Sequence, residues 1–191
     1  MLAAKVLKYL AFTLILLFGV FGLMFAAGYA IEDPGGWAAA GMIAAQLIPI
    51  IILAVLALWK PAWAAPVFVV ITVLVILFNI LDSSFGLLDR NVLGPIGSVS
   101  VLALALSLGF LGLRRTTLAG ILLVVLAVAQ FVATVIGFFG RMAGMDEVPP
   151  IGAMLGGSSG VVVVPILIVG ILFWVAGIVA KKSKPLEKVT A

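Results

Sequence analysis

Six apolar runs, each long enough to cross a lipid bilayer as a helix, dominate this sequence of 191 residues. A helix needs about 20 apolar residues to span the hydrocarbon layer. The runs cover residues 7–30, 37–58, 62–81, 96–113, 118–139 and 160–180. They lack the two-residue alternation of membrane β-strands, so we predict helices. The expected fold is all-α, a polytopic transmembrane six-helix bundle that forms a single integral membrane domain over residues 1–191.

The composition excludes a water-soluble domain and the commonest catalytic groups. Hydrophobic residues make up 65% of the chain and charged residues 9%, whereas a soluble domain is about half apolar and a quarter charged. The chain has no Cys and no His, so it has no disulfide, thiolate nucleophile, imidazole base or imidazole metal ligand. The runs carry no charged residue in their middle portions, which argues against a carboxylate proton relay. We therefore expect no enzymatic activity, no catalytic residue, no cofactor and no metal.

The basic residues predict the orientation of the bundle, because short cytoplasmic loops carry an excess of Lys and Arg. With the N-terminus in the cytoplasm, the inner connections hold nine basic residues: Lys5, Lys8, Lys60, Arg114, Arg115, Lys181, Lys182, Lys184 and Lys188. The outer connections hold two, Arg90 and Arg141. We predict that both termini are cytoplasmic and that residues 181–191 form a short basic cytoplasmic tail. This tail would lie against anionic lipid headgroups.

The first apolar run has a second interpretation, because Lys5 and Lys8 before an apolar stretch resemble a secretory signal. Small residues at Gly28 and Ala30 even offer a cleavage-like position. The stretch is longer than the usual signal core of about 7–15 residues, which favours an uncleaved first helix. Cleavage would leave five spans and an N-terminus outside.

A few uncharged polar residues and one proline lie deep in the runs and are the candidate site residues. The polar residues are Gln46, Thr72, Asn79, Ser107, Gln130 and Thr134. Pro49 removes a backbone hydrogen bond one turn after Gln46, so the freed carbonyl and the Gln46 amide are candidates for a small polar pocket. We select Gln46, Pro49, Asn79 and Gln130 as candidates either for a polar cavity or for hydrogen bonds between packed helices.

Small residues recur every fourth position, a spacing that lets helix backbones approach closely. The clearest stripes are Gly22, Ala26 and Ala30 in the first run, and Ala129, Ala133 and Gly137 in the fifth. Outside the runs, Glu32-Asp33 and Asp146-Glu147 form two acidic pairs on the predicted outer side. These pairs are either an acidic rim or, if the hairpins meet, ligands for a divalent cation.

The sequence alone predicts a class of protein and a location but no specific role. The expected function is a non-enzymatic structural or accessory membrane subunit; the alternative is a small transporter or channel for a neutral or apolar solute. The expected partners are the lipid bilayer and either another membrane protein or further copies of this chain, and no nucleic acid. The composition is typical of small multi-spanning proteins of bacterial plasma membranes, and we expect the chain to lie in such a cell membrane.

Overall fold

The computed structural model describes residues 2–32, 36–85, 96–142 and 158–182. Over these ranges the chain is all-helical, with no strand. The helices are α1 (Leu2–Glu32), α2 (Gly36–Trp59), α3 (Pro61–Phe85), α5 (Ile96–Arg114), α6 (Thr116–Met142) and α8 (Ser158–Lys182). Each of the six predicted apolar runs lies within one of these helices, so the predicted all-α bundle is confirmed. The acidic residues Asp33, Asp146 and Glu147, and the side chain of Glu32, lie outside the described residues.

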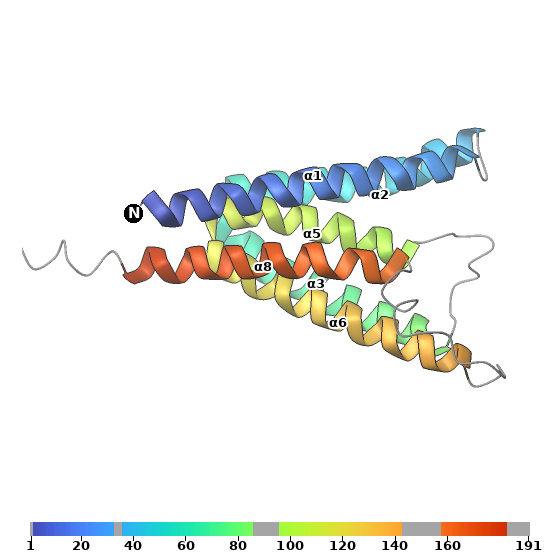
Figure 1. Ribbon diagram of the computed structural model, residues 1–191. Helices are drawn as coiled ribbons and strands as arrows, with labels where there is room; N and C mark the ends of the chain where they lie inside the picture. Colours follow the sequence, from blue (N-terminus) through green and yellow to red (C-terminus); the bar gives the residue numbers. More distant parts are fainter. Residues whose placement is uncertain (1, 33–35, 86–95, 143–157, 183–191) are drawn as a thin grey trace, which may run out of the picture.

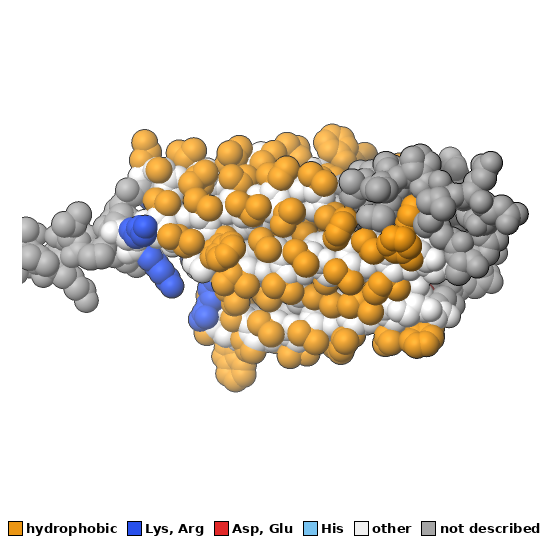
Figure 2. Space-filling view, turned by 60° about the horizontal axis from the view of Figure 1, so that its bottom comes forward, with side chains coloured by type: hydrophobic (Ala, Val, Ile, Leu, Met, Phe, Trp, Pro, Cys, Tyr) orange, Lys and Arg blue, Asp and Glu red, His pale blue; other side chains and the backbone are white. Residues whose placement is uncertain are grey.

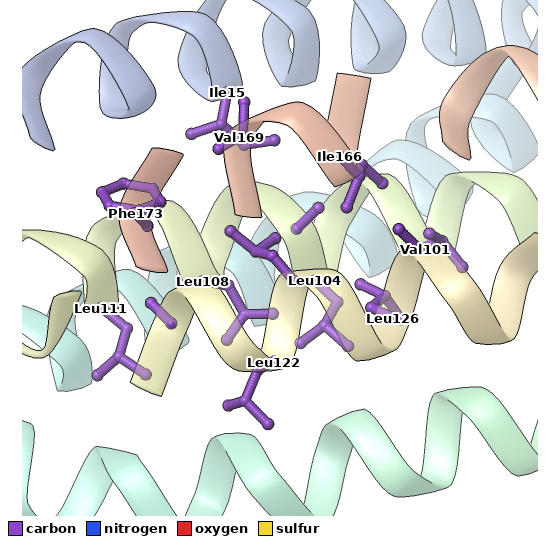
Figure 3. Packing of buried hydrophobic residues seen from close by; sticks show 14 of the residues in the cluster. Ile15, Val101, Leu104, Leu108, Leu111, Leu122, Leu126, Ile166, Val169 and Phe173 are labelled. Atoms are coloured by element: carbon purple, nitrogen blue, oxygen red, sulfur yellow. The ribbon is translucent and has the colours of Figure 1, made fainter. Parts of the chain in front are cut away.

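The shortest helix, α5, is the centre of the bundle, and the other five helices surround it (Figure 1). The five outer helices form a closed ring, in which consecutive helices contact each other in the order α1, α8, α6, α3, α2 and back to α1. Figure 3 shows the packing: Leu104 and Leu108 of α5 lie among Ile15 of α1, Phe173 of α8 and Leu126 of α6. All five side chains are almost completely buried. The core therefore lies on all sides of one helix.

Two connections consist of one residue each and hold consecutive helices tightly together. Lys60 joins α2 to α3, where its N–H donates to Leu56 O (2.9 Å) and its carbonyl accepts from Ala64 N (2.9 Å). Arg115 joins α5 to α6 in the same way, with bonds to Leu111 O (2.7 Å) and from Ala119 N (3.0 Å). Because these bonds continue the helical pattern, the backbone groups at each turn keep their partners.

The helices alternate in direction, so α1 begins and α8 ends at the same end of the bundle (Figure 1). The positive side chains gather at this end, and orange hydrophobic side chains cover most of the described surface between the two ends (Figure 2). We call it the basic end, and its described basic residues are Lys5, Lys8, Lys60, Arg114, Arg115, Lys181 and Lys182. Asp82, the one acidic residue whose side chain the structure describes, lies in the last turn of α3, toward the opposite end.

The surface and length of the helices indicate a membrane-embedded protein. Among the described residues, four helical segments are long and apolar enough to cross a membrane: Leu2–Phe25, Pro61–Phe85, Thr116–Gly140 and Val162–Lys182. Two shorter apolar segments, Leu47–Trp59 and Val99–Arg114, belong to α2 and α5. Large apolar side chains such as Ile52, Leu74 and Val128 are exposed on the outside of the bundle, where only lipid or another apolar surface suits them.

Candidate functional site

The three candidate residues whose side chains are described, Pro49, Asn79 and Gln130, do not share one environment. Pro49 is exposed on the surface of α2, and so is Ala45, whose carbonyl loses its usual donor because proline has no N–H. The freed carbonyl therefore lies on the outward side of α2, while α2 itself continues through Pro49. The side chain of Gln46 lies outside the described residues. The pocket that the sequence predicts from Gln46 and Pro49 therefore stays a prediction.

Asn79 and Gln130, by contrast, are both buried, on two helices that contact each other, α3 and α6. A Cβ on Gly137 of α6 would lie 3.8 Å from the Cβ of Ser83 of α3, so these two residues face each other. Asn79 precedes Ser83 by about one turn, and Gln130 precedes Gly137 by about two turns. Both helices begin at the basic end, so Gln130 lies about 4.5 Å closer to that end than Asn79 does.

Asn79 uses its amide on its own helix. The side chain is only 8% exposed, and its Nδ2 donates to the carbonyl of Val75 at 2.8 Å. That carbonyl lies one turn earlier in α3 and already accepts the normal helical bond, so the amide adds a second donor to it. The bond restrains the side chain against its own helix and uses one of the two hydrogens on its amide nitrogen.

Gln130 is the exception among the buried polar residues. Its side chain is 5% exposed, and its Oε1 is buried without a hydrogen-bond partner in the part of the chain that the structure describes. An amide oxygen buried without a donor costs about 1–3 kcal/mol. A group of this kind is rare in folded proteins and needs a physical explanation. Gln130 is therefore the candidate residue with unused hydrogen-bonding capacity.

The hydroxyl groups in the helices follow the pattern of Asn79. Thr72 donates to Phe68 O at 2.7 Å, Ser107 to Ala103 O at 2.9 Å, and Thr134 to Gln130 O at 2.8 Å. Each bond runs to the carbonyl four residues earlier, which is how Ser and Thr satisfy their hydroxyl groups inside helices. Thr72 and Ser107 are almost completely buried, so these bonds replace hydration that the site does not offer. The hydrogen of each of these three hydroxyl groups is therefore donated within its own helix.

The closest helix contact involves glycines that the four-residue stripes did not include. A Cβ on Gly120 of α6 would lie 2.8 Å from the carbonyl oxygen of Gly170 of α8, and one on Gly170 would lie 2.9 Å from Val124 N. One on Gly177 would overlap Thr117. Backbone therefore packs on backbone along this helix pair, which is also the most extensive interface in the bundle. The signal available in the sequence was the presence of glycines deep inside otherwise branched or bulky apolar runs.

The predicted stripes do serve packing where the structure describes them. Gly22 of α1 faces Leu102 of α5, where a Cβ would lie 2.7 Å from Leu102 Cδ1. Gly137 faces Ser83, as described above, and Ala133 is buried. The side chains of Ala26 and Ala30 lie outside the described residues. Gly22 and Gly137 therefore face other helices of the same chain.

The fold and these contacts define an all-helical, membrane-embedded bundle whose interior is mainly apolar. No protein-family model, no curated protein and no solved structure matches the chain. The assignment of a function therefore depends on the geometry of this chain.

Proposed function

We propose that this chain is a multi-pass protein of a plasma membrane, with both termini in the cytoplasm, that acts as a non-enzymatic structural or accessory subunit. The basic end supports the orientation, because positive residues accumulate on the cytoplasmic side of membrane proteins. The alternating helix directions bring the start of α1 and the end of α8 to that same side (Figure 1). Six helices crossing in alternation require both termini to lie on one face.

The observation that carries the proposal is the use of polar groups inside the bundle. Thr72, Asn79 and Ser107 are buried, and each donates a hydrogen bond to a carbonyl of its own helix. The centre around α5 is filled by aliphatic and aromatic side chains (Figure 3). A path for a polar solute needs polar groups that face a common lumen. An interior packed in this way favours a protein that acts through its surfaces and loops.

Affinity purification in mild detergent tests the accessory role. The tagged chain is expressed at its native level, solubilised in a mild neutral detergent and purified, and its mass is measured by light scattering. The accessory role predicts that one membrane protein co-purifies with the chain at a fixed ratio. As a control, an unrelated six-helix protein with the same tag should not bring down this partner. A chain that elutes alone as a monomer in several mild detergents contradicts the proposal.

One observation favours a second function, a transporter or channel for a neutral solute. The buried Oε1 of Gln130 has no partner among the described residues, and a solute with a hydroxyl or amide donor would supply one. Flux through reconstituted proteoliposomes tests this function. If such flux exists, Gln130→Leu should reduce it more than tenfold, whereas the outward-facing Thr13→Val should not. Flux that is unchanged when both Gln46 and Gln130 become Leu refutes the assignment of these residues.

A further inference from the structure

The basic end carries positive charge from four separate parts of the chain. They are the start of α1, the α2–α3 turn, the α5–α6 turn and the end of α8. Arg114, Arg115, Lys181 and Lys182 are exposed, while Lys8 is half-buried with its Nζ 4.8 Å from the centre of the Tyr9 ring. No acidic side chain lies at this end among the residues that the structure describes. The mutual repulsion of these charges is therefore not relieved within the described part of the chain.

The helix packing brings three of these groups to one level. Ile15 of α1 touches Gly109 of α5, and these helices run in opposite directions. Lys8 lies seven residues before Ile15 and Arg115 six residues after Gly109, so the two basic residues lie within about 2 Å of the same height. Their helices are neighbours, which places the two charges on one rim of the bundle.

The end of α8 joins the same level. Gly177 of α8 packs against Thr117 of α6, and these helices are also antiparallel. Lys181 is four residues beyond Gly177, and Arg115 is two residues before Thr117, so their heights differ by about 3 Å. Because α8 contacts α1 as well as α6, its last turn lies between Lys8 and the α5–α6 turn. Lys8, Arg115 and Lys181 thus lie at about the same level on neighbouring parts of the basic end, and we call these three residues the rim cluster.

The basic end has the side chains expected at the boundary between a membrane and water. Trp59 and Trp63 flank Lys60 at this end and are largely exposed, as aromatic residues at the headgroup level usually are. Exposed apolar side chains continue from this end along both helices, with Leu10 and Leu14 on α1 and Val175 and Ile178 on α8. A ligand held here has its anionic part beside Lys and Arg and its apolar part along these side chains. A free phosphate would use only the first of these two surfaces.

We infer that the rim cluster binds the phosphate of an anionic phospholipid, with the acyl chains lying along α1 and α8. Arg115 supplies a planar guanidinium that matches phosphate oxygens, and the two lysines supply point charges. Each positive charge near an anionic membrane surface contributes enough to change binding about fivefold. The inference rests on membrane embedding alone and is independent of any protein partner or transported solute.

Thermal unfolding of the purified full chain tests the inference. The protein is held in a neutral detergent and titrated separately with phosphatidylglycerol, phosphatidylcholine and inorganic phosphate. Phosphatidylglycerol should raise the unfolding temperature in a saturable manner, and the other two should not. The double variant Arg115→Gln/Lys181→Gln should bind it about 25-fold more weakly. Native mass spectrometry of retained lipid provides a second measurement if the variant unfolds early.

Control variants separate this site from general charge effects. Arg90→Gln and Arg141→Gln remove positive charge from the other side of the predicted topology, where Arg90 follows α3 and Arg141 is near the end of α6. The lipid response of this double variant should equal that of the unmodified chain. An equal response to phosphatidylcholine, an equal response to inorganic phosphate, or an equal loss of affinity in the control variant each overturns the inference. Co-purification of a partner protein is unaffected by any of these results, so the two proposals fail separately.

Discussion

Gly120 of α6 and Gly170 of α8 face each other so closely that a methyl group on Gly120 would lie 2.8 Å from the carbonyl oxygen of Gly170. Two helices approach to this distance only where neither has a side chain. In lipid, hydrophobic burial does not drive helices together, because lipid tails are as apolar as the side chains. Close backbone packing at these glycines is therefore a main source of stability for the pair α6–α8.

Gly120→Ala should destabilise the bundle, because the added methyl group meets backbone atoms that cannot rotate away. We expect a loss of about 2–3 kcal/mol in the free energy of unfolding, measured by detergent-induced unfolding in mixed micelles. Gly41→Ala in α2 is the matched control, since a Cβ there meets nothing within 4 Å. This control should be neutral or stabilising by about 0.5 kcal/mol, as for other exposed helical glycines. Equal effects of the two substitutions would contradict the close packing.

Gln130→Leu should stabilise the protein, because it removes a buried amide oxygen that has no partner among the described residues. The expected gain in the free energy of unfolding is about 1–2 kcal/mol, within the cost of an unsatisfied buried group. Thr72→Val serves as the comparison, since the Thr72 hydroxyl donates to Phe68 O and the loss of such a bond costs about 0.5–1.5 kcal/mol. A loss of stability in Gln130→Leu of 1 kcal/mol or more would show that the amide oxygen has a donor after all.

Leu108→Ala should be much more costly than Leu74→Ala, although both replace leucine in an apolar helix. Leu108 of α5 is 0% exposed and Leu74 of α3 is 59% exposed. Truncation of Leu108 leaves a cavity in the centre of the bundle and removes packing contacts, which costs about 2–4 kcal/mol. At Leu74, lipid fills the space and the change should stay below about 1 kcal/mol. Similar unfolding midpoints for the two variants would mean that α5 is not the central helix.

The contrast between Leu108 and Leu74 also shows where the sequence is informative and where it is not. Hydropathy located all six helices, because the length of an apolar run is set by the thickness of the bilayer. Hydropathy does not distinguish the interior from the outside of the bundle, since both are apolar. The central position of α5 was therefore not predictable from the apolar runs, and neither was the exposed position of Pro49.

For the polar residues, too, the sequence predicts some features and not others. Their positions along the helices follow from the sequence, but whether Asn79 and Gln130 share an interface depends on which helices become neighbours. That choice is made by side-chain fit, such as Gly137 against Ser83, and not by local preference. The glycines of the α6–α8 pair were missed because Gly170 and Gly177 are seven residues apart, two turns instead of one. Both spacings place small residues on one helix face.

The absence of native cysteine allows the orientation of the bundle to be measured directly. Single cysteines are introduced at Ser84, near the end of α3 opposite the basic end, at Ser158, the first residue of α8, and at Ser183 after the last helix. Intact cells are treated with a membrane-impermeant maleimide. Six crossings with both termini in the cytoplasm predict labelling at positions 84 and 158, and labelling at 183 only after permeabilisation. Labelling of position 183 in intact cells would contradict the account.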